Sequence, residues 1–422
     1  MKNKLIEICK NAKKASNQVI DNKIKNKVLL KFAQLVNKNK FKILSNNKKD
    51  VFNAKKNGLK NNMIQRLELN EKKIEDIVSS IKQISSIKQI SRMKDPVNVI
   101  LKKWKRPNGL KMRRVTVPLG VVGVIYESRP NVTSDVSCLC FKSGNCVILR
   151  GGSEAYYSNK LISDLFREAL KFYNVNINYV QFIKHKSRKI VQLMLSNTKD
   201  YIDVIIPRGG KGLVKTVQDY SKIPVIGHLE GVCHTYVDEH ANLKMAEKIV
   251  VNAKMRNTSI CGATETLLIH EKVLKKYAHS ILKKLEKKNC IIYADKKIQN
   301  IYKGRTKSAN LSDWSKEYLS AEIAVKSVKN LDEAINHINT YGTMHTDAII
   351  TKNKRKANLF MKKVKSSIAI HNSSTQFADG GEFGFGGEVG ISTNKLPPRG
   401  PVGLAQLVTY KYEVYGSGQI RD

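Results

Sequence analysis

The sequence predicts an α/β protein that contains parallel sheets. Its 422 residues are enough for two or three domains at roughly 150 residues per domain. Three observations predict this class: helical periodicity in the N-terminal region, a hairpin signal after it, and two long stretches in which short apolar strands alternate with amphipathic helices. Alternating strands and helices form βαβ units, and these units build parallel sheets.

The first region is predicted to be helical and to end in a hairpin. From about residue 5 to residue 90, apolar residues recur every three or four positions, which is the period of a helix. The pattern stops at Asp95-Pro96, because proline disfavours continuation of a helix. Residues 97–104 and 111–117 then flank Asn108-Gly109, the strongest short-range hairpin signal.

Alternation of strands and helices follows in two stretches. In the first, the predicted elements are strand 121–126, helix 132–141, strand 146–149, helix 153–172, strand 201–206 and helix 211–220. In the second, they are helix 241–255, strand 266–270, helix 272–288, strand 291–294, strand 322–325, helix 331–340 and strand 348–351. The chain then becomes glycine-rich and ends in alternating apolar and polar residues, which predicts a C-terminal strand that pairs with another element.

Composition and charge exclude several classes of protein. Hydrophobic residues make up 41% and charged residues 26%, which is ordinary globular usage. No stretch reaches the ~20 apolar residues of a membrane span, and the first residues have no signal-peptide core, so we expect a cytoplasmic protein with no membrane partner. The net charge of +41 comes mainly from Lys, whereas Arg, which is preferred for bidentate phosphate contacts, is scarce. We therefore assign the charge to solvated faces and expect no nucleic-acid partner.

Two glycine-rich turns follow predicted strands and open predicted helices. They are Leu149-Arg150-Gly151-Gly152-Ser153 and Pro207-Arg208-Gly209-Gly210-Lys211-Gly212. Parallel sheets bind dinucleotides at this edge, where amides at the helix N-terminus meet phosphate. Either turn alone is also consistent with a plain linker, but the pair favours a phosphate-bearing ligand.

The cysteines are expected to be reduced, and one of them is a candidate nucleophile. The chain has seven cysteines and no CxxC pair. Cys138, Cys140 and Cys146 lie among apolar residues with no histidine at metal-ligand spacing, so we expect buried thiols and no metal. Cys233 lies in a predicted strand. Cys261 stands in a short stretch of small polar residues between a helix and a strand, where a thiol can meet a ligand.

Several sequence blocks closely resemble the γ-glutamyl phosphate reductases, a family within the aldehyde dehydrogenase superfamily. The blocks are VPLGVVGVIYESRPNVT (117–133), KSGN (142–145), RGGSEA (150–155), IIPRGGKG (205–212), HINTYG (337–342), HTDA (345–348), EFG (382–384), GIST (390–393) and RGP (399–401). They span the chain from about residue 97 to its C-terminus, whereas the N-terminal helices match in pattern more than in motif.

The resemblance implies an aldehyde dehydrogenase-like fold of three parts. A Rossmann-like NADPH-binding domain would comprise residues 1–233, with residues 367–390 returning to it. A catalytic α/β domain would comprise residues 234–366. The hairpin at 97–117 and a C-terminal strand within 391–422 would form an oligomerisation element, which implies a homo-oligomer.

The resemblance also implies a reaction. This is the NADPH-dependent reduction of L-glutamyl 5-phosphate to L-glutamate 5-semialdehyde and phosphate through a cysteine thioester, the second step of proline biosynthesis. Because the acyl phosphate is labile, the resemblance also suggests functional coupling to a glutamate 5-kinase.

Catalytic roles follow from the resemblance for two residues. Cys261 would be the nucleophile, and the Asn131 side-chain amide together with the Cys261 backbone N–H would stabilise the oxyanion. Judged from the residues alone, Asn131 is better explained as an N-cap of the helix predicted from Val132.

Cofactor contacts would come from the two glycine-rich turns: Arg150, Gly151, Gly152, Ser153, Arg208, Gly209 and Gly210. The superfamily places a lysine at the position of Arg150, and NAD-preferring members often place an acidic residue at that of Ser153. An arginine without a carboxylate favours a 2′-phosphate and hence NADPH, although Glu154 is adjacent.

Candidates to hold the substrate are Arg129 and the polar turn Asn372-Ser373-Ser374, although such a turn is most often only a turn.

Departures from the family pattern leave alternatives open. Gly262 stands where Asn is usual and Gly387 where Ala is common. The glutamate that activates water in hydrolytic members is replaced by His228, and Glu230 is displaced from that place by two residues, so water should be a poor acceptor of the acyl group. The alternatives are a superfamily member that acts on another acyl phosphate or aldehyde, and a Lys-rich nucleic-acid-binding protein built on a degenerate reductase.

Overall fold

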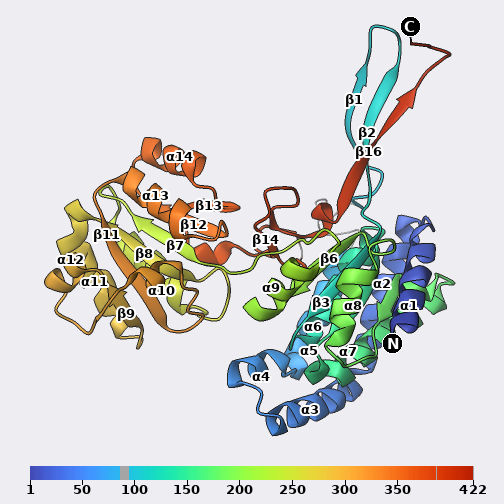
Figure 1. Cartoon of the computed structure of the whole chain (residues 1–422), viewed down its shortest axis with the longest axis horizontal. Coiled ribbons are helices and arrows are strands. Elements are labelled where there is room, and N and C mark those ends of the chain that lie inside the picture. Colours follow the sequence, from blue (N-terminus) through green and yellow to red (C-terminus); the bar gives the residue numbers. More distant parts are fainter. Residues whose placement is uncertain (86–94, 386, 422) are drawn as a thin grey trace. The chain divides into compact units, whose positions relative to one another are not determined.

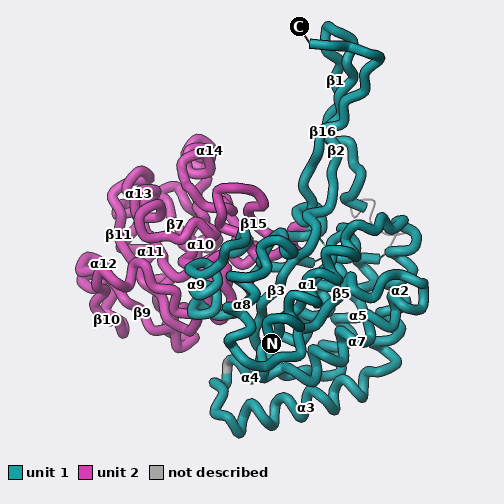
Figure 2. The backbone as a smooth tube through the Cα atoms, turned by 45° about the vertical axis from the view of Figure 1, so that its right-hand side comes forward, with its two compact units in different colours: residues 1–227, 384–390, 402–422 teal, residues 228–383, 391–401 magenta. Residues whose placement is uncertain are grey.

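The computed structural model describes residues 1–85, 95–385 and 387–421 (Figure 1). The chain divides into two compact units (Figure 2). Unit 1 comprises Met1–Gly227, Gly384–Gly390 and Val402–Asp422, and unit 2 comprises His228–Phe383 and Ile391–Pro401. The predicted α/β class is confirmed. The last residues of the predicted N-terminal helical region, 86–90, lie outside the described residues.

Helices form the first part of unit 1, as the apolar periodicity predicts. They are α1 (Lys2–Ser16), α2 (Asn22–Lys38), α3 (Lys40–Lys56), α4 (Asn61–Leu67) and α5 (Glu71–Ser85). The Asp21 side chain caps α2 by accepting a hydrogen bond from Lys23 N at 2.7 Å. Among the described residues, no helix is long and apolar enough to cross a bilayer.

A parallel four-stranded sheet forms the centre of unit 1. Its strands are β3 (Val121–Tyr126), β4 (Cys146–Gly151), β5 (Val180–Phe182) and β6 (Val204–Arg208), in the order β5-β4-β3-β6. The connecting helices are α6 (Pro130–Lys142), α7 (Tyr156–Phe172), α8 (Lys189–Asn197) and α9 (Lys211–Tyr220). Every residue of β3 is buried, which is typical of a parallel strand covered on both faces. Tyr126 pairs with Gly151 on one side and Arg208 on the other, so both glycine-rich turns lie at the same edge of this sheet.

The predicted hairpin and C-terminal strand form one three-stranded antiparallel sheet in unit 1. Strand β2 (Lys111–Pro118) lies between β1 (Ile100–Lys105) and β16 (Val408–Tyr415). This sheet extends from the rest of unit 1 as a narrow arm (Figures 1 and 2). Trp104 of β1 and Tyr412 of β16 meet edge to face, with ring centroids 6.0 Å apart.

Unit 2 contains a parallel seven-stranded sheet in the order β10-β9-β11-β8-β7-β12-β13. The strands are β7 (Cys233–Val237), β8 (Thr264–His270), β9 (Ile291–Ala294), β10 (Lys307–Ser308), β11 (Glu322–Val328), β12 (Thr346–Ile350) and β13 (Ile368–His371). The helices are α10 (Leu243–Met255), α11 (Leu274–Glu286), α12 (Lys296–Ile301), α13 (Leu331–Tyr341) and α14 (Lys354–Lys363). A separate pair of short strands, β14 (Ile391–Ser392) and β15 (Gly400–Pro401), also belongs to this unit.

The expected division of the chain differs from the observed one at three places. The first segment of unit 1 ends at Gly227 rather than at residue 233, and Cys233 already begins β7 of the unit 2 sheet. We expected residues 367–390 to return to the first domain, but only 384–390 do so. The reason is that β13 pairs in parallel with β12, with Ile368 opposite Thr346, which fixes this segment at the edge of the unit 2 sheet. Residues 391–401 also belong to unit 2, so the C-terminal element of unit 1 begins at Val402 rather than at residue 391.

Candidate active site

Cys261 lies in unit 2, in the loop between α10 and β8. The loop begins with a turn in which Asn257 Oδ1 accepts a hydrogen bond from Ser259 N at 3.0 Å, and Ala263 N donates to Ile260 O at 3.0 Å. The Cys261 side chain is half-buried and packs against the apolar cluster of Ile368, Ala378 and Ile391. The other six cysteines are buried, so Cys261 alone combines a loop position with partial exposure.

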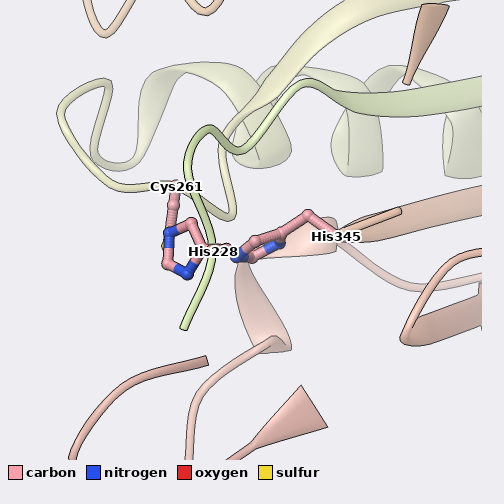
Figure 3. Close-up of side chains that lie close together, drawn as sticks. All are labelled: His228, Cys261 and His345. Carbon is pink, nitrogen blue, oxygen red and sulfur yellow. The ribbon is translucent and has the colours of Figure 1, made fainter. Parts of the chain in front are cut away.

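Two histidines lie close to the Cys261 thiol (Figure 3). One donor atom from each of His228, Cys261 and His345 lies within 4.8 Å of the other two. The two imidazole rings meet edge to face, with centroids 4.7 Å apart. His228 Nδ1 lies 2.7 Å from Ile391 O, and His345 Nδ1 lies 2.9 Å from Thr346 Oγ1.

The histidines reverse the effect of burial on the thiol. Burial by itself raises the pKa of Cys261, but the interactions with His345 and His228 hold that pKa well below its usual value. The opposite holds for Cys138, because burial, reinforced by Asp135, raises the pKa of its thiol well above the usual value. Cys261 is therefore the thiol whose surroundings favour the nucleophilic thiolate, and its catalytic role stays a prediction.

The segment 230–233 packs against the backbone of Cys261. A Cβ on Gly231 would lie 2.3 Å from the Cys261 carbonyl oxygen, so only glycine fits this close approach. Gly231 N donates to Glu317 Oε1 at 2.8 Å, and burial raises the pKa of that carboxyl group, with further contributions from Cys261 and Glu230. The Cys233 thiol donates to Cys261 O at 3.0 Å, which confirms a packed thiol on a strand.

The arginine in the turn after β4 donates hydrogen bonds to backbone carbonyl oxygens. The Arg150 guanidinium is buried and donates to Gly151 O at 2.8 Å and to Lys186 O at 3.1 Å. Its terminal nitrogens therefore hold the loop after β5. Ser153 is exposed, and the Glu154 carboxylate turns away to accept a hydrogen bond from Ser128 N at 2.7 Å.

The turn after β6 already holds an anionic oxygen at a helix N-terminus. Gly210 N, just before α9, donates to Glu127 Oε2 at 3.0 Å. A Cβ on Gly209 would lie 2.5 Å from the same oxygen. Arg208 lies 3.6 Å from the Glu388 carboxylate within unit 1. A backbone amide of this turn therefore already binds an anionic oxygen.

Asn131 does not cap its helix. Helix α6 begins at Pro130, with Arg129 as the residue before it, so the N-cap interpretation of Asn131 is wrong. Proline at the first helical position is preorganised for a helix start, which moved the start ahead of the predicted residue. The Asn131 amide donates to Asp135 Oδ2 at 3.1 Å, and burial raises the pKa of Asp135 to about 6. Arg129 is half-buried.

The polar turn predicted to hold substrate is itself tightly hydrogen-bonded. Asn372 has a φ of 55°, and its side chain bonds Thr351 N and O, each at 2.9 Å. The Ser374 hydroxyl accepts a hydrogen bond from Gln376 N at 3.3 Å. These residues and Ser373 line a cavity of about 380 Å³, whose cations are Lys248 and Arg256. The turn shapes that cavity, and its cations suit a carboxylate or a phosphate.

A second group of potential metal ligands in unit 2 serves a structural purpose. Asp238, Glu239 and His270 lie close together. Lys356 contacts Asp238 at 2.9 Å and Glu239 at 2.6 Å, and Lys272 contacts Glu239 at 2.7 Å. The charge of these carboxylates is thus balanced by the chain's own lysines. The Cys261 group offers ligands suited to a soft ion such as Zn²⁺, but bound metal would occupy the thiolate.

Comparison with known protein families identifies the fold family. A sequence model of the aldehyde dehydrogenase family matches residues 2–290, more than half of the chain. The chain belongs to the aldehyde dehydrogenase family. Within it, the chain is 45% identical over 397 residues to a protein named gamma-glutamyl phosphate reductase from Clostridium botulinum strain Eklund 17B, covering 94% of each. A protein of the same name from Carboxydothermus hydrogenoformans is 45% identical over 419 residues, or 99% of each.

Solved structures agree with this family assignment. A gamma-glutamyl phosphate reductase from Thermotoga maritima is 40% identical, with a TM-score of 0.94, over 99% of this chain and 100% of that one. An acetylating aldehyde dehydrogenase from Geobacillus thermoglucosidasius shares only 15% identity at a TM-score of 0.70, and so shows the fold alone. The resemblance found in the sequence blocks is confirmed.

Membership of this family implies a nicotinamide cofactor. The residues of unit 1 fit such a group, because the Gly210 amide before α9 already binds a carboxylate oxygen and can bind a phosphate oxygen in the same way. A nicotinamide, when bound, supplies or accepts a hydride. The turns after β4 and β6 are the part of the chain that would hold it.

Sequence reasoning missed two residues beside Cys261. His345 was noticed only as part of a matching block, and Glu317 was not noticed at all. His228 was noted as a replacement for a glutamate, which was a signal of an unusual site. His345 directly precedes a buried strand, and nothing in the sequence indicated that it would contact Cys261.

Proposed function

We propose that this protein reduces L-glutamyl 5-phosphate to L-glutamate 5-semialdehyde and phosphate with NADPH, the second step of proline biosynthesis. The support from comparison is the name carried by relatives that are 45% identical over nearly their whole length. The single structural observation that carries the proposal is the Cys261 thiol close to two imidazoles that lower its pKa. A thiolate suits attack on an acyl phosphate, which is already activated. The direct test is the reverse reaction, in which NADPH forms from the semialdehyde, phosphate and NADP⁺.

In this proposal Cys261 attacks the 5-carbonyl carbon and expels phosphate. The resulting thioester keeps a carbonyl that is electrophilic enough to be reduced to the aldehyde. Negative charge develops on the carbonyl oxygen in each addition, and we assign its donors as the Cys261 backbone N–H and the Asn131 amide. Losing one such donor typically costs about 3 kcal/mol of transition-state stabilisation.

We also propose that the cofactor is NADPH rather than NADH, because of the cations on the loop that Arg150 holds. Arg150 does not face outward, but it holds the loop that carries the exposed cations Lys184, Lys186 and Arg188 after β5. Exposed cations on this loop, together with an uncharged residue at Ser153, favour a 2′-phosphate over a free 2′-hydroxyl.

Neutralising this loop is expected to weaken NADPH binding selectively. We expect Lys186→Gln combined with Arg188→Gln to lower NADPH affinity about tenfold, or ~1.4 kcal/mol, and to leave NADH affinity unchanged. The measurement is a fluorescence titration with each nucleotide. The matched control is Lys215→Gln with Lys222→Gln, which removes two charges from unit 1 at and after α9. Equal loss for both nucleotides would show that the loop does not contact the 2′-phosphate.

The substrate and the partners are assigned by the chemistry of the chain. We propose that Arg129 and the cavity at Asn372, Ser373 and Ser374 take the charged ends of the substrate, with Lys248 and Arg256 supplying positive charge. Coupling to a glutamate 5-kinase and a location in the cytoplasm stay predictions.

We propose a homo-oligomer assembled through the arm of β1, β2 and β16. Tyr410, Tyr412 and Val414 of β16 and Leu101 of β1 are exposed there. An arm that carries so many exposed apolar side chains is expected to be covered by a second copy of the chain.

A further inference from the structure

The orientation of His228 fixes which of its nitrogens can exchange a proton with Cys261. Nδ1 lies 2.7 Å from the carbonyl oxygen of Ile391 in β14, and a carbonyl oxygen only accepts. Nδ1 therefore carries a hydrogen, and the lone pair that can accept a proton from the thiol is on Nε2. His228 is half-buried, whereas His345 is fully buried, so His228 is the imidazole that substrate can reach.

The reaction proposed above needs a proton at two points. Attack requires loss of the Cys261 thiol proton, because the thiolate is the nucleophile. When the bond between the acyl carbon and the bridging oxygen breaks, the electron pair stays on that oxygen, and a fully ionised phosphate would be a very poor leaving group. A proton delivered to the phosphate at that moment lets it leave as hydrogen phosphate.

We propose that His228 is a catalytic acid–base residue that carries the proton from the Cys261 thiol to the departing phosphate. The S–C bond forms as the C–O bond breaks, and Nε2 first takes and then gives the same proton. The net change is a thiol and an acyl phosphate dianion giving a thioester and hydrogen phosphate, so no further reactant is required. This inference rests on the proposed function and adds a residue to it.

The other groups around Cys261 fit this division of roles. His345 also lowers the pKa of Cys261, but it is fully buried, and we assign it as a positioning residue. Its Nδ1 lies 2.9 Å from Thr346 Oγ1 and 3.5 Å from Cys233 Sγ, and its ring packs edge to face against His228. The carboxylates that face the site are Glu317 and Glu230. Their negative charge favours a protonated His228 and opposes the thiolate, so the histidines must outweigh them, as the lowered pKa of Cys261 indicates.

The first test follows alkylation of Cys261 by iodoacetamide against pH, with the modified peptide identified by mass spectrometry. His228→Asn keeps a donor near the Nδ1 position for Ile391 O and removes Nε2. We expect the midpoint to shift upward by one unit or more, so that the rate at about pH 6.5 falls at least ~tenfold. His228→Gln, which cannot titrate, should behave in the same way. His279→Asn, an exposed histidine on α11, is the control and should match the wild type.

The second test separates proton delivery from thiol ionisation. At about pH 9 much of the thiol ionises without help, because an ordinary cysteine has a pKa near 8.5. The γ-4-nitrophenyl ester of glutamate has a leaving group that departs as a stable anion. We expect His228→Asn to release nitrophenolate at about the wild-type rate there. With glutamyl phosphate made in situ by a glutamate 5-kinase and ATP, it should stay ~100-fold slower or more.

These tests distinguish a failure of the role assigned to His228 from a failure of the proposed function. Superimposable alkylation profiles for His228→Asn and the wild type would overturn the role of His228. It would also be overturned if the rate of His228→Asn at high pH returned to the wild-type rate with the acyl phosphate as well as with the ester. Faster alkylation of the wild type after a chelator is added would show that the three residues hold a metal, and would also overturn it. Failure of the wild type to use glutamyl phosphate would instead refute the proposed function, while the alkylation profile would still report on His228.

Discussion

Replacing Cys261 with alanine is expected to abolish turnover, by more than about a thousandfold, while NADPH still binds. The reason is that the thiolate is the only nucleophile assigned to the acyl carbon. The turns assigned to the cofactor belong to unit 1, whereas Cys261 belongs to unit 2. The measurements are steady-state rate and fluorescence titration of NADPH.

Two controls make the Cys261→Ala result specific. Cys261→Ser keeps the size of the side chain but supplies a weak nucleophile, so it should be nearly as inactive. Cys138→Ala removes a fully buried thiol from unit 1 and should lower stability by about 1 kcal/mol with little effect on turnover. If Cys261→Ala keeps a tenth of the wild-type activity, covalent catalysis through this residue is wrong.

Oxidation of glutamate 5-semialdehyde is expected to depend on phosphate and to give no free glutamate directly. Hydrolytic members of the family use a glutamate to activate water, whereas here His228 stands at that place and its Nε2 is assigned to proton transfer between Cys261 and phosphate. Glu230 is displaced by two residues. The thioester should therefore be released by phosphate and only poorly by water.

The experiment compares steady NADPH formation with and without phosphate, and scores products by chromatography. Spontaneous hydrolysis of the acyl phosphate and cyclisation of the glutamyl thioester to 5-oxoproline are measured separately and subtracted. Comparable steady turnover with free glutamate in phosphate-free buffer would show that a residue activates water. Glu317 is the first residue to test, through Glu317→Gln, because its carboxyl group faces Cys261.

The sequence predicted most of the fold because its local signals agree with the tertiary structure. Asn108-Gly109 lies in the tip between β1 and β2, and the alternating residues near the C-terminus form β16. Buried apolar runs became the parallel strands of both sheets. Residues 367–383 were misplaced, because β13 is short and its pairing with β12 depends on a long-range register that local periodicity does not encode.

Within the candidate site, the sequence indicated a residue only where the neighbouring residues in the sequence were themselves informative. Cys261 was found from its setting in a loop of small polar residues. His345 was not connected with it, because the two meet only when β8 and β12 enter the same sheet on either side of β7. The orientation of Arg150 could not be read from sequence either, since it depends on the carbonyl oxygens of the loop after β5. Side-chain direction in a folded turn is a property of tertiary contacts.

Formation of a glutamyl thioester on Cys261 is the central claim, and one single-turnover experiment tests it most directly. The enzyme is mixed with glutamate 5-semialdehyde and NADP⁺ in phosphate-free buffer, and both NADPH absorbance and the mass of the Cys261 peptide are followed. We predict a burst of NADPH equal to the active-site concentration, a glutamyl group on Cys261, and release of that group when phosphate is added. Steady turnover without a burst, or a burst with an unmodified Cys261 peptide, would contradict the account.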